Sequence, residues 1–161
     1  MIVVSDTSPI INLATIGHLH LLPELFTEIV IPTAVFNEVA GDGNHEPGAK
    51  EIREASWVKV HSAPNQPLLP QLLHDLDPGE AEAIALAVNM KAEYVLIDEA
   101  LGRKIAVSHQ LQPLGILGIL LLAKQRGLIA AVTPLMDRLR SEANFYVDAR
   151  LYQYIKKLAE E

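Results

Sequence analysis

The sequence contains no cysteine among its 161 residues, and this absence excludes several classes of protein. Without thiols the chain can form no disulfide framework, no thiolate zinc site and no cysteine nucleophile. The lack of cysteine suits a reducing compartment, so we expect a cytoplasmic protein. Half of the residues are hydrophobic and a fifth are charged, which is enough apolar material for one buried core of ordinary size.

Long apolar runs are also missing. The N-terminus, Met1 to Ser5, has no basic region and no extended apolar stretch, so it does not have the pattern of a signal peptide. The longest apolar run, Leu114 to Ala123, is too short to span a bilayer and is followed by a basic segment. We therefore expect no membrane contact and interpret this run as a buried helix.

Basic residues are scarce and unevenly distributed. A net charge of −7 argues against a protein that coats nucleic acid through a broad basic surface. Residues 1–100 contain four Lys/Arg and fifteen Asp/Glu, whereas residues 101–161 contain nine Lys/Arg and five Asp/Glu. Such an imbalance is a hint of nucleic-acid or membrane contact. The alternative is that the two segments simply neutralise each other within one fold.

Short apolar strands alternate with helices along most of the chain. Expected strands are Met1–Ser5, Glu28–Ile31, Trp57–His61, Tyr94–Ile97 and Pro113–Ile116. Expected helices are Pro9–Ile16, His18–Phe26, Thr33–Ala40, Pro47–Ala55, Asp77–Met90, Glu99–Val107, Gly118–Arg126, Thr133–Phe145 and Asp148–Glu160. The proline-rich stretch Ser62–Pro70 is expected to be a linker or surface loop. The pattern predicts an α/β fold with three layers, α/β/α, around a mostly parallel sheet.

Four acids occupy positions that such a sheet places near one edge. Asp6 and Asp98 directly follow predicted strands, Glu38 lies close to an apolar helix face, and Glu80 is in the first turn of its helix. Ligands of parallel sheets bind beyond the carboxyl ends of the strands. Converging carboxylates need a counter-ion, and carboxylate ligands without His or Cys suit Mg²⁺ or Mn²⁺. Such ions activate water and neutralise phosphate charge, so the implied reaction is hydrolysis of a phosphodiester.

Each acid also has a purely structural explanation. Asp6 and Asp98 can cap the helices that follow them, and Glu80 fits a capping box at the start of its helix. Glu38 alone is typical of a partly solvated helix acid. Glu82 lies two residues beyond Glu80 and faces away from it, so we interpret it as a solvated or supporting residue. The six histidines show no ligand spacing and receive no metal role.

The order of these motifs is more specific than any one acid. The motifs are Val3–Ser8, Ile31-Pro32 followed by Val35 and Glu38, Gly79–Ala87, and Leu96–Glu99 followed by Gly102-Arg103. Together they resemble the PIN-domain family of metal-dependent ribonucleases, which includes the VapC-type toxins of toxin–antitoxin pairs. The resemblance extends from residue 1 to about residue 140. Leu76–Ile84 is similar to the Leu-Asp-x-Gly-Glu-x-Glu-Ala-Ile segment of a prokaryotic PIN branch without a characterised function.

The resemblance assigns roles to individual residues. Four residues match the acidic quartet of the family, namely Asp6, Glu38, Glu80 and Asp98. The resemblance implies that they are metal ligands and catalytic residues. Thr7 or Ser8 matches a position that supports the metal site. Many toxin members carry Asp where this chain has Glu80, and Glu82 therefore competes with Glu80 for the role of third acid. Mg²⁺ or Mn²⁺ is the implied cofactor.

The resemblance also implies partners and a domain organisation. We expect residues 1–161 to form a single PIN-like domain, with C-terminal helices about 133–161 packing on it or at a dimer interface. An RNA substrate, a small antitoxin protein and a second copy of the chain are the implied partners. The leading hypothesis is a metal-dependent endoribonuclease, and the alternative is a non-catalytic nucleic-acid-binding or partner-binding module. A phosphatase of the haloacid-dehalogenase type has little support, because Ser8 stands where that family needs a second acid.

The basic and aromatic residues of the second half leave two interpretations open. Arg103 and Lys104 follow Asp98 by about one helical turn, and we expect them to bring positive charge to an approaching phosphate backbone. Lys124 and Arg126 suit a helix C-terminus, and Arg138 and Arg140 are expected to be solvated. Aromatic residues interleaved with cations can stack unpaired bases; those near the C-terminus are Phe145, Tyr146, Tyr152 and Tyr154, among Arg150, Lys156 and Lys157. An amphipathic helix is the preferred interpretation, and its face towards a core or a second subunit is Leu151, Ile155 and Leu158.

Overall fold

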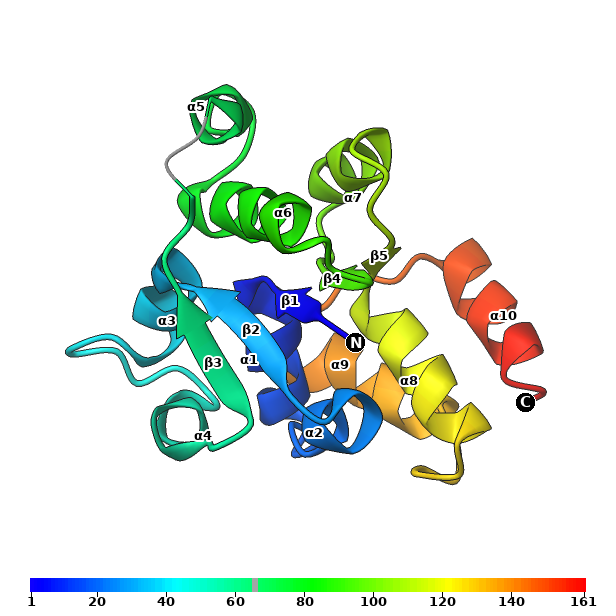
Figure 1. Ribbon diagram of the computed structural model, residues 1–161. Coiled ribbons are helices and arrows are strands. Elements are labelled where there is room, and N and C mark those ends of the chain that lie inside the picture. Colours follow the sequence, from blue (N-terminus) through cyan, green and yellow to red (C-terminus); the bar gives the residue numbers. More distant parts are fainter. Residues whose placement is uncertain (65–66) are drawn as a thin grey trace.

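The structure is a computed structural model that describes residues 1–64 and 67–161. Its sheet is parallel throughout, with the strand order β3-β2-β1-β4-β5 (Figure 1). The strands are β1 (Val3–Ser5), β2 (Ile29–Pro32), β3 (Val58–His61), β4 (Tyr94–Leu96) and β5 (Pro113–Leu114). All five strands predicted from the sequence are therefore present, and so is the parallel sheet.

Helices connect these strands and cover both faces of the sheet. They are α1 (Thr7–Thr15), α2 (Leu21–Phe26), α3 (Thr33–Ala40), α4 (Ala49–Glu54), α5 (Leu68–Leu72), α6 (Pro78–Met90), α7 (Ala100–Ser108), α8 (Ile116–Gln125), α9 (Thr133–Glu142) and α10 (Ala149–Leu158). The prediction of a loop over Ser62–Pro70 was wrong at its C-terminal end, where α5 begins; residues 65–66 lie outside the described part. Pro70 is compatible with α5 because the first turn of a helix needs no backbone N–H donor.

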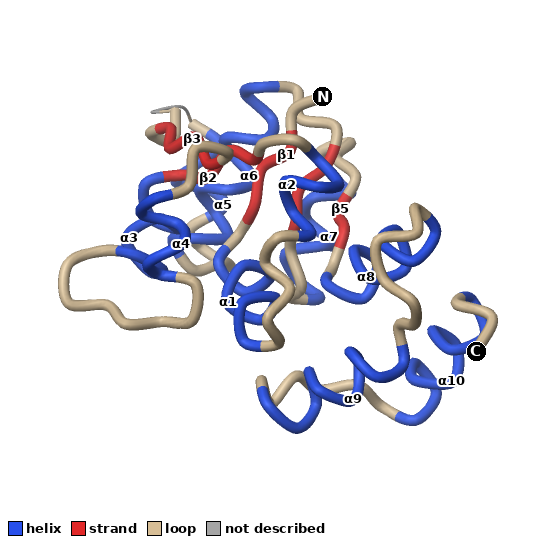
Figure 2. The backbone as a smooth tube through the Cα atoms, turned by 90° about the horizontal axis from the view of Figure 1, so that it is seen from below, coloured by secondary structure: helices blue, strands red, loops and turns tan. Residues whose placement is uncertain are grey.

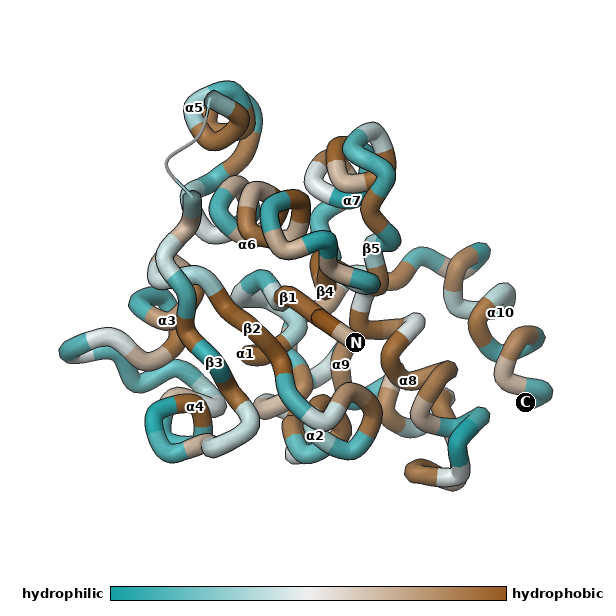
Figure 3. The backbone as a smooth tube through the Cα atoms, in the orientation of Figure 1, coloured by the Kyte–Doolittle hydropathy of each residue, from teal (hydrophilic) through white to brown (hydrophobic). Residues whose placement is uncertain are grey.

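The period-2 geometry of the strands divides the core into two layers. Val3, Ile31 and Leu96 point to one face and pack with α1, α2, α8 and α9. Val4 and Val95 point to the opposite face and pack with α5, α6 and α7. Figure 1 shows α5, α6 and α7 on one side of the sheet, and Figure 3 shows hydrophobic residues concentrated in β1 and β2. The fold is the predicted three-layer α/β/α arrangement.

The strand order predicts where on the sheet a ligand binds. The chain moves from β1 to β2 and β3 in one direction and then crosses β1 to add β4 and β5. The strand order therefore changes direction between β1 and β4, and this is the position where α/β sheets bind ligands. Ser5 pairs with Leu96, and the Asp6 backbone N–H donates to the Leu96 carbonyl at 2.9 Å. The ends of these two strands are thereby aligned.

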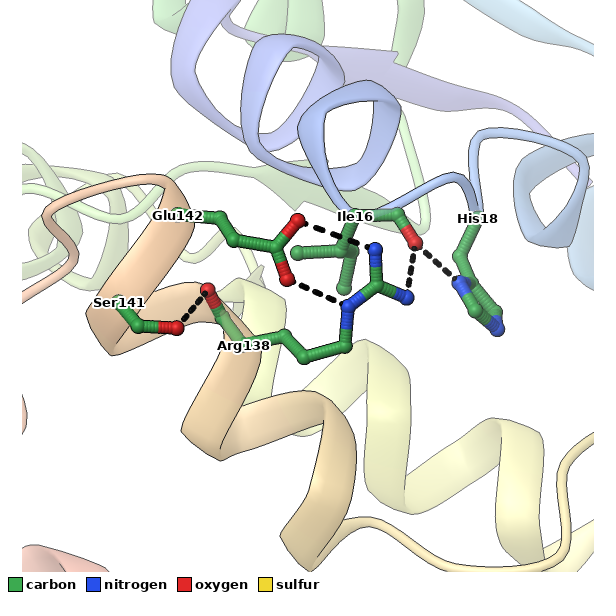
Figure 4. Close-up of polar contacts among 5 residues, drawn as sticks. All are labelled: Ile16, His18, Arg138, Ser141 and Glu142. Carbon is green, nitrogen blue, oxygen red and sulfur yellow. Dashed lines mark hydrogen bonds and ion pairs between the residues drawn. The ribbon is translucent and has the colours of Figure 1, made fainter.

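The C-terminal helices are tied to the rest of the protein by both polar and apolar contacts. Arg138 Nη1 donates to the Ile16 carbonyl at 3.0 Å, and His18 Nδ1 bonds to the same oxygen at 2.6 Å (Figure 4). Glu142 holds the guanidinium from the other side through a 2.6 Å contact. Arg138 is thus both solvated, with its side chain 43 % exposed, and hydrogen-bonded to a carbonyl at the end of α1, where carbonyl groups lack partners within their helix.

Helix α10 lies beside α8 and shares its core through Ile155 (Figure 2). Tyr152 links α10 to α9, since its hydroxyl donates to Asp137 at 2.8 Å and Arg140 lies over its ring at 5.0 Å. Ile155 is buried as predicted, whereas Leu151 and Leu158 are exposed. No helix in the described ranges is both long enough and apolar enough to cross a bilayer.

Candidate functional site

Asp6 and Glu38 approach each other under the start of α6. Asp6 is 3 % exposed at the end of β1, and Glu38 reaches it from α3. A Cβ atom at Gly79 would lie 2.8 Å from Glu38 Oε1 and 3.2 Å from Asp6 Oδ1. Glycine at this position therefore lets α6 pack closely against both carboxylates, and a larger residue would have to displace the end of the Glu38 side chain. Thr7 fixes the pair further, because its hydroxyl donates to Glu38 Oε2 at 2.5 Å.

The environment of Asp6 strongly disfavours its charged form. The pKa of the Asp6 carboxyl is raised to about 8, chiefly by burial and also by the nearby charges of Glu80, Asp77 and Glu38, while the Thr7 backbone N–H opposes the shift. As a cap for α1 the side chain makes no hydrogen bond, so the capping explanation of Asp6 does not hold. Asp6 is a buried acid that lacks a counter-charge.

Glu80 is both a helix-cap residue and an acid with a free oxygen. The predicted capping box is present: the Glu80 N–H donates to Asp77 Oδ1 at 2.9 Å, and the Asp77 N–H donates to Glu80 Oε2 at 3.2 Å. The other carboxylate oxygen, Oε1, is buried and has no hydrogen-bond partner among the described residues. Burial is the main cause that raises the pKa of Glu80. Capping therefore uses one oxygen and leaves the other available for a ligand.

Asp98 does not cap the helix that follows it, so the capping explanation of Asp98 is wrong. Its Oδ1 instead accepts the Ile116 N–H at 2.8 Å, at the first residue of α8. Its Oδ2 is buried, with no hydrogen-bond partner in the described part of the chain. Burial raises the pKa of Asp98 to about 6, against the opposing effects of the Ile116 N–H and Arg103.

Glu82 serves a neighbouring helix instead of the acidic group. Its Oε1 accepts the Ala34 N–H at 3.3 Å, in the first turn of α3. The contact satisfies a backbone donor that a helix start leaves free. Because α3 also carries Glu38, Glu82 acts as a support for that residue. The structure thus gives Glu80 and Glu82 different surroundings, and Glu80 is the one beside Asp6.

Three of the four predicted acids, Asp6, Glu38 and Glu80, are linked through the charge of Asp6, whereas Asp98 has different charged neighbours. Glu80 and Glu38 both act on the charge of Asp6, whereas the charges acting on Asp98 are those of Arg103 and Glu99. Across residues 1–64 and 67–161, no three Asp, Glu or His side chains are arranged to hold a single ion. The chemistry of the donor set nevertheless fits Mg²⁺ or Mn²⁺, because unpartnered buried carboxylate oxygens are the ligands these ions prefer.

Arg103 lies directly next to Asp98. A Cβ atom at Gly115 would be 2.9 Å from Asp98 Oδ1 and 3.2 Å from Arg103 Nη1, so the loop before α8 passes close to both groups. Lys104 follows on α7 and is exposed. The positive charge predicted near the acids is therefore present at Arg103, at the edge of the site where a phosphate would approach.

A cavity of about 400 Å³ opens beside Asp98, and two of its lining residues, Asn12 and Asn144, were not predicted from the sequence. Ser8 and Asn12 line it from α1, and Asn144 lines it from the connection between α9 and α10. Helical spacing offered a signal for Asn12, which follows Ser8 by four residues on the same face of α1. No local pattern pointed to Asn144, because its position depends on how α9 packs.

Comparison with known proteins identifies the family. A family model described as PIN domain matches residues 2–161, almost the whole chain. Neither a search of curated proteins nor a search of solved structures gave a significant match. PIN domains are in general nucleases, and they generally use divalent metal ions. With a match over nearly its full length, and with the parallel sheet described above, this chain belongs to the PIN-domain family.

Proposed function

We propose that the protein is a Mg²⁺- or Mn²⁺-dependent endoribonuclease that hydrolyses RNA phosphodiester bonds. The residues that would hold the ion and carry the catalysis are Asp6, Glu38, Glu80 and Asp98. The observation that carries the proposal is a pair of buried carboxylate oxygens, Glu80 Oε1 and Asp98 Oδ2, without partners in the described structure. An unpartnered buried charge is costly, and a bound cation compensates that cost.

Each proposed residue has a distinct task. A bound divalent ion supplies an activated water and neutralises charge on the phosphate. Thr7 holds Glu38, and Glu82 holds the start of the helix that carries Glu38. The α6 capping box fixes Glu80, and the Ile116 N–H fixes Asp98. Arg103, which lies beside Asp98, would contact the phosphate of the substrate.

One observation favours a second candidate, a non-catalytic binding module. The described acids include no group of three in an arrangement that would hold one ion. Calorimetric titration with Mn²⁺ separates the two candidates. Binding that disappears in Asp98→Asn supports the nuclease, and the absence of any carboxylate-dependent binding supports the module.

Cleavage of single-stranded RNA in Mn²⁺ tests the proposed activity. We expect Asp6→Asn and Asp98→Asn to lose cleavage while circular dichroism shows an intact fold, because each change removes one anionic ligand and little volume. Asp42→Asn, in the exposed loop after α3, is the matched control and should cleave like the wild type. Unchanged cleavage in both site variants would refute the assignment.

We extend the proposal to the partners and location that the family resemblance implies. A homodimer and a complex with a small antitoxin, in which the protein is the toxin, are supported by the exposed apolar residues Leu151 and Leu158 on α10. A cytoplasmic location is supported by the absence of cysteine. Sedimentation of the purified chain tests the dimer: a monomeric mass would contradict that part of the proposal.

A further inference from the structure

The connection between α9 and α10 forms a wall shared by two hollows next to Asp98. The first, the polar hollow, is lined by Ser8, Asn12, Asp98, Asn144, Phe145 and Tyr146. The second, the apolar hollow of about 310 Å³, is lined by Asp98, Arg103, Leu117, Phe145, Tyr146 and Leu151. Both hollows therefore share Asp98 with the two aromatic residues. A ligand seated in either hollow would contact the acidic site and the aromatic side chains together.

Tyr146 is held in an exposed position by anchors on both sides. Asn144 adopts a left-handed conformation with φ of 51°, and the Phe145 N–H donates to the Leu139 carbonyl at 3.0 Å. Phe145 packs against the main core, and Val147 is 3 % exposed. Tyr146 lies between these two inward-packed residues and points outward. It is 83 % exposed on a connection that its neighbours fix.

An exposed aromatic ring on an anchored connection indicates a binding role rather than a packing role. Burial would normally stabilise a ring of this size, so leaving it in water forgoes that gain. Because Val147 and Phe145 already anchor the connection, Tyr146 contributes little to the core. The ring is instead available to a flat ligand that enters from solvent.

The chemistry around Tyr146 selects the kind of ligand. Ser8, Asn12 and Asn144 supply hydroxyl and amide groups that both donate and accept hydrogen bonds. Arg103, in the apolar hollow, supplies a cation next to Asp98. A nucleobase has the matching features: a flat face that stacks on an aromatic ring, a polar edge and an attached phosphate. A purely apolar peptide would leave the hydroxyl and amide groups without partners.

We propose that Tyr146, together with Phe145, forms a stacking platform for one unpaired base of a single-stranded RNA, with Arg103 contacting a phosphate of the same strand beside Asp98. The platform rests on the proposed nuclease function, for which it supplies substrate selection. Only an unpaired base can stack on the ring and turn its edge towards Asn12 and Asn144. Duplex RNA keeps its bases paired and stacked, so the platform favours single strands.

Steady-state cleavage of a short single-stranded RNA in Mn²⁺ tests the platform. We expect Tyr146→Ala to raise KM by roughly 5- to 100-fold with a smaller effect on kcat, because one base–aromatic stack is lost. Tyr146→Phe keeps the ring and should retain the wild-type KM. Tyr154→Ala is the matched control, since Tyr154 is also exposed (53 %) but lies on α10 outside both hollows. A wild-type KM in Tyr146→Ala, or an equal loss in Tyr146→Phe, overturns the inference.

Photocrosslinking separates failure of the platform from failure of the nuclease proposal. Single-stranded RNA that carries 5-iodouridine is irradiated with the wild-type protein, and the crosslinked peptide is identified by mass spectrometry. A crosslink at Tyr146 or Phe145 supports the platform even if the protein does not cleave RNA. Cleavage with crosslinks only at other residues overturns the platform and leaves the nuclease intact. If the protein neither crosslinks to single-stranded RNA nor cleaves it, both the platform and the nuclease proposal are overturned.

Discussion

Replacing Asp6 by asparagine is expected to change how the stability of the metal-free protein depends on pH. The pKa of Asp6 is raised from 3.8 to about 8, chiefly by burial, so the folded protein keeps this proton over a range in which the unfolded chain has lost it. The folded state then binds more protons than the unfolded state. Its free energy of unfolding must therefore fall as pH rises from about 4 to about 8.

The size of this effect follows from the shift. Each pKa unit corresponds to about 1.4 kcal/mol, so the shift from 3.8 to about 8 amounts to roughly 6 kcal/mol, comparable with the total stability of a small domain. Below pH 4 the group is protonated in both states and contributes no penalty. Above pH 8 the folded protein carries the buried charge and the whole penalty is present. Asparagine is neutral throughout and removes this contribution at every pH.

Urea unfolding in EDTA, at pH values between 4 and 9, measures the effect. We expect the wild type to lose stability relative to Asp6→Asn as pH rises, and Asp42→Asn to follow the wild type. Adding Mn²⁺ should restore wild-type stability at pH 8, because the ion binds the charged form and supplies the missing counter-charge. Parallel pH profiles for the wild type and Asp6→Asn would refute the idea that Asp6 is a buried acid without a counter-charge.

Three further changes test the surroundings of the site. Gly79→Ala should weaken Mn²⁺ binding in calorimetry, because the new Cβ would lie 2.8 Å from Glu38 Oε1; unchanged affinity would show that the carboxylate moves freely aside. Glu82→Ala should lower stability by about 0.5–2 kcal/mol in urea unfolding through loss of the α3 cap, and should reduce RNA cleavage less than Asp98→Asn does. Ile155→Ala should cost roughly 2–5 kcal/mol, since the side chain is buried where α10 meets α8; a loss well below this range would mean that α10 is only loosely attached.

Local sequence signals predicted those helices and strands whose ends are marked by residues with strong conformational preferences. Asp77-Pro78-Gly79-Glu80 predicted both the start of α6 and its capping box, because a cap depends on residues within one turn. Short apolar runs predicted β1 and β4 for a similar reason. Helix α5 was missed because its three nearby prolines also fit a loop, and only packing on α6 distinguishes the two.

The partners of the acids depend on contacts that no local pattern contains. Asp98 accepts a hydrogen bond from Ile116, eighteen residues away, and this contact exists only because α8 starts beside the end of β4. Arg138 reaches Ile16 across 122 residues, which sequence periodicity could not indicate. The positions of the acids at strand ends and helix starts were predictable, and their degree of burial and hydrogen bonding followed only from the packed layers.

The central claim is that buried carboxylates at the edge between β1 and β4 bind a divalent ion. Anomalous X-ray diffraction from crystals grown with Mn²⁺ tests it most directly, because the manganese signal locates the ion without reference to activity. We predict an anomalous peak at this edge of the sheet, within ligand distance of carboxylate oxygens of Asp6 and Glu80, and no such peak in crystals of Asp6→Asn. A manganese peak only at other residues, or none at this edge of the sheet at saturating Mn²⁺, would contradict the account.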